Sequence, residues 1–325
     1  MNKTKDFQVK QIVDGIYEIE TRYLGREKYA ACYLVEDAGE VAIIETNTNY
    51  AVPRILAALE HLGLEKKQVK YVILTHIHLD HAGGTGELMR QLPHPQLVVH
   101  PRGKKHMIEP EKLIASVKEV YGEHQYQKLY GEILPIPKDR VLTGEDGDIL
   151  HLGTRDLLLL HMDGHAKHHF IIHDKKSNTI FSGDNFGIGY PKMIFNDSRL
   201  LFPSTSPTQF EPENALLTYQ RIVDLAPSCI LLTHYGCLED INDGFAQLVQ
   251  WITFSKERGS FHYNQGHRDQ VLIDKLRLDL WAELEKEVTK RRGSGLTPDE
   301  KELLQLDTDL NAQGIAYYIA KLNTK

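Results

Sequence analysis

Residues 69–86 read VKYVILTHIHLDHAGGTG, and the interpretation of the whole chain depends on this stretch. Its first half, residues 69–75, is β-branched and aliphatic, which predicts a short buried strand. A turn with three glycines and a short helical pattern follow it, and Pro93 ends that helix. Between strand and turn lie four side chains that can bind a metal ion: His76, His78, Asp80 and His81.

The spacing of these four side chains favours a metal site. Imidazole and carboxylate groups suit zinc or iron. Alternate side chains of an extended segment point the same way, so His76 and His78 can reach one ion. Asp80 and His81 come after the turn and are expected to face a second ion. A single histidine is more often a surface or core residue, but four ligand types behind one buried strand are hard to explain by packing alone.

Composition limits the possible classes of protein. The 325 residues suffice for one large domain with an extension, or for two domains. The net charge is −7 without a long run of one sign, so we expect neither nucleic acid nor a membrane surface as partner. No apolar run approaches the roughly 20 residues that span a bilayer, and no signal-peptide core follows the N-terminus. The three cysteines lack CxxC spacing, and their odd number disfavours a disulfide framework, so we expect a cytoplasmic protein.

Strand and helix signals alternate over the first two thirds of the chain. Strands are predicted at 9–13, 16–21, 30–35, 41–45, 97–99, 149–152, 156–162, 170–173, 179–182 and 230–233. Helices are predicted at 53–62, 103–131 and 211–225. This alternation is typical of an α/β protein whose helices cover a sheet. After residue 239 only helical patterns remain, at 245–254, 269–291 and 297–322, so we expect domains of residues 1–238 and 239–325.

Three later strands end in the same kinds of side chain. The first is followed by a turn with His165, the second by Asp184 and the third by His234. Ligands at the ends of several strands would converge on one edge of a sheet sandwich. A site for two metal ions could form there.

The pattern Thr75-His-x-His-x-Asp-His with glycines behind it resembles the signature of the metallo-β-lactamase superfamily. The resemblance implies an αββα sandwich, here with an all-helical C-terminal extension. It also implies two divalent metal ions per chain; we expect zinc, with iron or a mixed iron–zinc pair as alternatives. By similarity the first ion is bound by His76, His78 and His165, the second by Asp80, His81 and His234, and Asp184 bridges them.

The chain departs from the family pattern at two places. Where the family often has Gly-His-Thr-x-Gly-Ser, residues 164–169 read GHAKHH, and we expect His168 to orient a metal ligand. The usual Leu-Ile-Asp after an early strand is replaced by Ile44, Glu45 and Thr46. The carboxylate at that position is therefore longer by one methylene group.

The resemblance implies a hydrolase in which a hydroxide bridging the two metals attacks a thioester, ester or lactone carbonyl of a small-molecule substrate. The signature looks like those of the glyoxalase II and acyl-homoserine-lactonase branches. The long loop 184–210 and the helical tail look closer to the branch of the quinolone-signal response thioesterase. Asp80 could also orient the hydroxide or carry a proton. Tyr190 and Tyr235 are candidate catalytic residues that could hydrogen-bond the substrate or oxyanion, although tyrosines near a site more often pack.

Other functions remain open. One alternative on the same fold is a diiron protein that binds or senses oxygen, although flavodiiron reductases usually carry Glu in place of His78. A second alternative is a phosphodiesterase. The acidic net charge gives no support for a nucleic acid as its substrate. The C-terminal helices could instead cap the pocket, bind a protein partner or form a homodimer. Seven intact ligand positions argue against a degenerate site.

Overall fold

The computed structural model describes residues 8–323, which form two compact units. The first unit contains residues 8–161, 168–183 and 228–237. The second contains residues 162–167, 184–227 and 238–323. This division interleaves segments along the chain, whereas the predicted division separates residues 1–238 from 239–325. The division at residue 238 therefore stays a prediction.

Two mixed β-sheets form the body of the first unit. The seven-stranded sheet has the order β1-β2-β3-β4-β5-β6-β7 and comprises β1 (Val9–Val13), β2 (Ile16–Glu20), β3 (Ala31–Asp37), β4 (Glu40–Ile44), β5 (Val69–Ile73), β6 (Gln96–Val99) and β7 (Val141–Thr143). Its first four strands are antiparallel, and β4 to β7 are parallel. The six-stranded sheet has the order β15-β14-β11-β10-β9-β8 and comprises β8 (Ile149–Leu152), β9 (Arg155–His161), β10 (Phe170–Asp174), β11 (Thr179–Gly183), β14 (Cys229–Leu232) and β15 (Gly236–Leu238).

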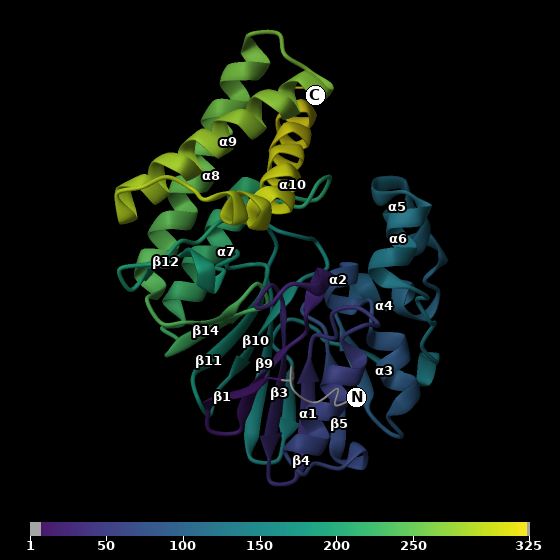
Figure 1. The fold of residues 1–325 in the computed structure, drawn as a ribbon. Helices are drawn as coiled ribbons and strands as arrows, with labels where there is room; N and C mark the ends of the chain where they lie inside the picture. The colour runs from purple at the N-terminus through teal and green to yellow at the C-terminus, as the bar shows by residue number, and fades with distance from the viewer. Residues whose placement is uncertain (1–7, 324–325) are drawn as a thin grey trace. The chain divides into compact units, whose positions relative to one another are not determined.

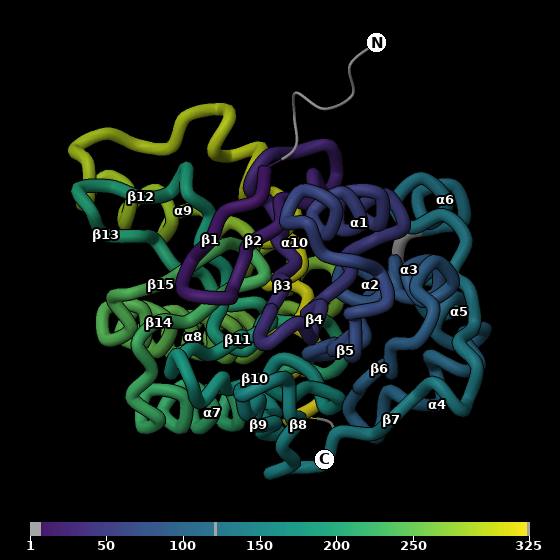
Figure 2. Tube along the Cα trace, turned by 90° about the horizontal axis from the view of Figure 1, so that it is seen from below, coloured from purple at the N-terminus to yellow at the C-terminus, as the bar shows by residue number. Residues whose placement is uncertain are grey.

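The two sheets pack face to face, and Figure 2 shows them as two rows of strands. Tyr33 of β3 crosses between them: its ring lies edge-on to Phe181 of β11, with 5.4 Å between centroids. Its hydroxyl donates a hydrogen bond of 2.5 Å to the carbonyl of Leu232 in β14. The β-branched and aliphatic strands predicted from the sequence are therefore buried in a sandwich, as expected for strands covered on both faces.

Helices of the first unit flank the seven-stranded sheet (Figure 1). They are α1 (Val52–His61), α2 (Leu79–Ala82), α3 (Thr85–Gln91), α4 (Pro101–Ile108), α5 (Glu111–Tyr121) and α6 (Glu123–Tyr130). Helix α1 has proline in its first turn and buries Ile55 and Leu59 against the core of the first sheet. The helical region predicted at 103–131 is confirmed, as three separate helices.

The second unit is helical apart from a short hairpin in the part of the chain that the structure describes. Its elements are α7 (Pro212–Asp224), α8 (Ile241–Asn264), α9 (Asp269–Arg292), α10 (Pro298–Leu322), β12 (Ile194–Phe195) and β13 (Ser198–Arg199). Thr297 caps α10: its hydroxyl accepts from the amide of Glu300, whose carboxylate accepts from the amide of Thr297. Gly259 of α8 allows Ile315 and Ile319 of α10 to approach closely, since a Cβ there would lie about 3 Å from both.

The structure corrects several predicted boundaries. Strands β7, β12, β13 and β15 were not predicted, because two or three residues are too few to show a period of two. Helix α8 continues to Asn264, beyond the predicted end at 254, where the sequence becomes polar. Within residues 8–323 no helix is both long and apolar enough to cross a membrane.

Candidate metal centre

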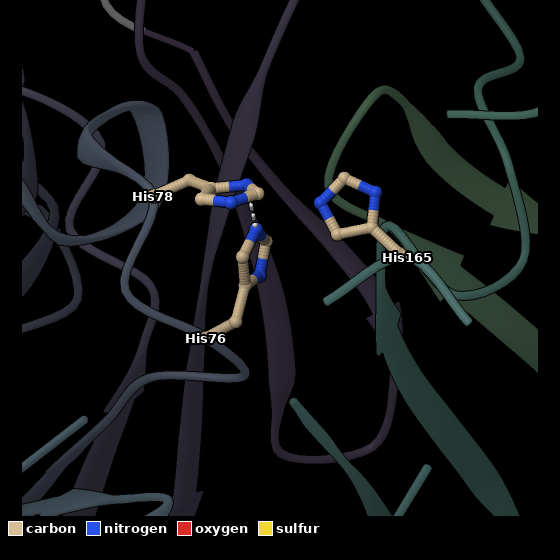
Figure 3. A group of neighbouring side chains, drawn as sticks. All are labelled: His76, His78 and His165. Atoms are coloured by element: carbon tan, nitrogen blue, oxygen red, sulfur yellow. Dashed lines mark hydrogen bonds between the residues drawn. The ribbon is translucent and has the colours of Figure 1, made fainter. Parts of the chain in front are cut away.

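The predicted metal-binding stretch begins just after the C-terminal end of β5, a central strand of the first sheet. The amide of Phe170 donates to the carbonyl of Thr75, with 2.9 Å between the atoms, which ties this end of β5 to the second sheet. His76 and His78 follow on an extended segment and point toward each other, with 3.0 Å between Nε2 of His76 and Nδ1 of His78 (Figure 3). Asp80 and His81 then lie on α2, a single helical turn.

The loop after β4 holds α2 through hydrogen bonds to the backbone carbonyls of α2. The amide and hydroxyl of Thr46 both donate to the carbonyl of His81, and the side-chain amide of Asn47 donates to the carbonyl of Asp80 at 2.8 Å. Gly84 permits the two segments to touch, because a Cβ there would lie 2.7 Å from the carbonyl oxygens of Thr46 and Thr48. Glycine in the signature is therefore required by backbone contact.

Asp80, His81 and His234 form one group within the first unit. Their ligand atoms all lie within 4.8 Å of one another. Oδ2 of Asp80 is 3.4 Å from Nε2 of His234 and 3.7 Å from Nε2 of His81. His234 donates from Nδ1 to the carbonyl of Tyr29 at 2.9 Å, which leaves its Nε2 lone pair directed to the group. His76 also belongs near this group, since one of its ring nitrogens lies within 4.8 Å of one of His81.

Glu45, the carboxylate that differs from the family pattern, lies beside two of the predicted ligands. Its Oε1 accepts from the amide of Thr75 at 3.1 Å and from the hydroxyl of the same residue. That hydroxyl is 3.1 Å from Nδ1 of His76. Oε2 of Glu45 lies 3.5 Å from Nδ1 of His81. One buried carboxylate thus acts directly on His81 and, through Thr75, on His76.

The other two predicted ligands, His165 and Asp184, belong to the second unit. Nδ1 of His165 donates to the carbonyl of Ser204 at 2.9 Å, and the hydroxyl of Ser204 donates to Oδ2 of Asp184 at 2.9 Å. The same Oδ2 lies 3.6 Å from Nε2 of His165. Ser204 therefore fixes the ring orientation of His165 and the position of one carboxylate oxygen of Asp184.

Helix α7 shapes the turn that carries His165. The hydroxyl of Thr218 donates to the carbonyl of Asp163 at 2.5 Å, and the amide of Glu211 donates to the carbonyl of Gly164 at 3.0 Å. Gly164 has a φ of 125°, and a Cβ there would lie 2.6 Å from Cα of Ala215. Only glycine suits this close approach.

The donor chemistry of both sets fits a transition metal. They offer imidazole nitrogens, two of them oriented by hydrogen bonds from the opposite ring nitrogen to a carbonyl, and two carboxylates. Such mixed nitrogen and oxygen donors suit zinc and iron alike. Within the first unit the structure brings together five of the seven predicted ligands, and within the second unit the other two.

The two tyrosines predicted as catalytic both have acidic partners. The hydroxyl of Tyr190 donates to Oδ2 of Asp307 at 3.0 Å within the second unit. Tyr235 is buried in the first unit, and burial together with the charges of Glu18 and Glu20 raises the pKa of its phenol well above the usual value. Tyr235 is therefore a neutral hydrogen-bond donor at any physiological pH. These contacts favour structural roles, and catalytic roles for both stay predictions.

The adjacent histidines 168 and 169 both lie next to the predicted ligands. His169 is fully buried and stacks on His76, with ring centroids 4.7 Å apart. His168 is only partly buried and stands edge-on to His78, with centroids 5.3 Å apart. The sequence singled out His168 alone. It gave no signal for Tyr29, whose backbone carbonyl makes the contact, or for Ser204, which contributes a carbonyl and a hydroxyl group but belongs to no motif.

Known proteins resemble this chain in sequence and in fold. The acyl-coenzyme A thioesterase MBLAC2 of Homo sapiens is 25% identical over 264 residues, which cover 77% of this chain and 82% of that protein. The metallo-beta-lactamase superfamily protein ST1585 of Sulfolobus tokodaii superposes with a TM-score of 0.63 at 19% identity, covering 93% of this chain and 98% of that one. The chemotaxis sensor ODP, solved as a peroxy diiron species, superposes with a TM-score of 0.53 at 12% identity, covering 75% of this chain and 94% of that one. The two structures establish the fold alone.

A family model completes the comparison. The model described as the metallo-beta-lactamase superfamily matches residues 25–234, which is more than half of the chain. The matched range includes both sets of predicted ligands, from His76 to His234. The chain therefore belongs to the metallo-β-lactamase superfamily.

Proposed function

We propose that this protein is a metal-dependent hydrolase that cleaves an acyl thioester. The observation that carries the proposal is the group of Asp80, His81 and His234, whose ligand atoms lie within 4.8 Å of one another and whose rings are buried. Buried histidines beside a carboxylate are expensive to desolvate unless a cation or hydrogen bonds compensate. A metal ion at this group supplies that compensation.

The proposed centre uses all seven predicted ligands and holds two ions. As the family resemblance implies, His76, His78 and His165 would hold one ion and Asp80, His81 and His234 the other, and both ions would share Asp184. The order of these residues along the chain and the oriented rings of His165 and His234 support the assignment. Bound divalent ions supply a water that ionises near neutral pH and polarise the carbonyl of the substrate.

The residues of this chain would divide the remaining work. Asp80 keeps about a quarter of its side chain exposed, whereas His81 is fully buried. Asp80 can therefore accept a hydrogen bond from an incoming water and take up its proton, while His81 serves binding only. Glu45 and Thr75 hold the rings of His81 and His76 in place.

The thioester is proposed from the relative in Homo sapiens, whose likeness extends over 77% of this chain. The glyoxalase II and lactonase resemblance of the signature points to the same reaction class, attack on an activated carbonyl. Zinc is the proposed metal, with iron as the alternative. The likeness to the diiron sensor concerns the fold only and adds no support for oxygen binding.

The test is a panel of acyl-coenzyme A thioesters, lactones and phosphodiesters, measured before and after removal of metal by a chelator. We expect thioester hydrolysis that chelation abolishes and added zinc restores. The variant His81→Ala should be inactive, and His151→Ala is the matched control, because His151 is an exposed histidine paired with Asp156. Two irons with an oxygen-dependent visible spectrum and no hydrolysis would replace this proposal by the diiron alternative.

A further inference from the structure

Ser204 is the link between the C-terminal helices and the ligands of the second unit. Its carbonyl orients His165 and its hydroxyl donates to Asp184, each at 2.9 Å. Ser204 lies in a long loop outside the helices and strands, so its own position must be fixed by contacts with other elements. Leu201 and Phe202, earlier in the loop, are bound by Gln247 of α8 and by the backbone of Ile188, and the contacts directly on either side of Ser204 come from α10.

Asn311 of α10 binds the peptide groups on both sides of Ser204. Its side-chain amide donates to the carbonyl of Pro203 at 2.7 Å, and its Oδ1 accepts from the amide of Thr205 at 2.7 Å. The hydroxyl of Thr205 donates to the same Oδ1 at 2.9 Å. Asn311 and Thr205 are both almost completely buried. One side chain thus holds Ser204 from either side, and water cannot replace it easily.

Two more turns of α10 contact the same loop. Gly314, almost one turn beyond Asn311, lies against Thr205, where a Cβ would come within 2.3 Å of the carbonyl oxygen. Asp307, about one turn before Asn311, accepts the hydrogen bond from Tyr190. The helix and the loop therefore meet along one face of α10 with direct backbone contact at Gly314.

We propose that Asn311 is a positioning residue for His165 and Asp184, so that α10 forms part of the metal centre. Without the amide, the carbonyl of Pro203 and the amide of Thr205 lose their buried partners, and the loop must shift to find others. Ser204 moves with it, and both ligands lose the contacts that orient them. The proposal rests on the metal centre proposed above, but its first test needs no metal.

That first test uses metal-free protein with ¹⁵N-labelled histidine. In the wild type the ring resonances of His165, assigned by their loss in His165→Asn, should show the proton on Nδ1, held against exchange by Ser204. Asn311→Ala should give a mixture of tautomers with fast exchange. The matched control is Thr308→Ala, a buried polar residue on the same helix whose hydroxyl donates to the carbonyl of Leu304 within α10. The control should leave His165 unchanged.

The second test measures zinc affinity by competition with a chelator. Asn311→Ala should weaken the site that includes His165 about 10-fold to 100-fold, as is typical when a residue supporting a ligand is lost. Gly314→Ala provides an independent variant: it removes no polar group, yet it displaces Thr205 and should weaken the same site. Unchanged His165 resonances and affinity within twofold of wild type in both variants would overturn the proposal. If wild-type protein binds no zinc, the proposed function fails, and the resonance test still decides the role of Asn311.

Discussion

The two units support their predicted ligands by different means. In the first unit, the supporting residues lie next to paired strands: the loop 45–48, directly after β4, binds the backbone of α2, and Tyr29, just before β3, orients His234. In the second unit, His165 and Asp184 share Ser204, which is held from α10 more than 100 positions along the chain. The first set of supporting residues is attached directly to paired strands, whereas the second depends on a long loop.

This difference teaches where the site should be vulnerable. Strands inside a sheet, such as β3 and β4, are fixed by ladders of backbone hydrogen bonds, which side-chain substitutions leave intact. Loops lack such ladders and depend on a few side-chain contacts. We therefore expect replacement of a ligand to weaken zinc binding equally in both units. Replacement of a supporting residue should weaken only the ligands that it contacts.

The largest expected effect is loss of a ligand from either unit. His81→Ala and His165→Ala should each weaken zinc binding more than about 100-fold, beyond the range seen for residues that only support ligands. Titration of metal-free protein with zinc, followed by competition with a chelator, measures both. An effect on His165→Ala smaller than tenfold would break the comparison, because it would remove His165 from the centre.

Next comes Glu45→Gln in the first unit. The substitution keeps the shape of the side chain but removes the negative charge 3.5 Å from His81. Zinc affinity should fall about 10-fold to 100-fold. Glu45→Asp should recover part of the loss, since it restores the charge and shortens the side chain by one methylene. Wild-type affinity in Glu45→Gln would show that the carboxylate serves folding alone.

A smaller effect is expected from Ser204→Ala in the second unit. The variant loses the hydroxyl that donates to Asp184 but keeps the carbonyl that accepts from His165. Zinc affinity should therefore fall about tenfold, at the lower end of the range for supporting residues. A loss as large as that of His165→Ala would mean that the hydroxyl has a larger role than the geometry assigns to it. Isothermal titration calorimetry resolves the two cases.

The smallest effect on metal binding should come from Asp174→Ala. Asp174 pairs with the buried Arg155, and β10 runs from Phe170, next to Thr75, to Asp174 at its opposite end. Removing one partner of a buried ion pair costs about 3–5 kcal/mol of stability. Urea unfolding should show that loss, while zinc affinity stays within twofold of wild type. A matching loss of zinc affinity would mean that metal binding depends on the overall stability of the fold.

The sequence predicted the parts of this molecule that follow from local patterns. Strands β5, β9 and β14 are runs of aliphatic residues, and the ligands at or just after their ends were found for that reason. Gly84 was visible as part of a glycine-rich turn, although its close contact with Thr46 was not. The three C-terminal helices were also predicted, because their apolar residues repeat with helical spacing.

The remaining contacts could not be predicted because they join distant residues without a periodic pattern. Asn311 lies 106 positions beyond Thr205. Neither residue stands in a motif that would distinguish it from the other polar residues nearby. Tyr29 contributes a backbone carbonyl to His234, which no side-chain pattern reveals. The choice between His168 and His169 depended on which ring faces inward, and only the fold decides that.

The central claim is that the seven side chains hold two metal ions. Native mass spectrometry of the purified protein, after metal removal and titration with zinc, counts the bound ions directly. The account predicts two zinc ions per chain in the wild type and fewer than two in both His81→Ala and His165→Ala. A folded wild-type protein that binds no zinc or iron, or that binds two ions in both variants, would contradict it.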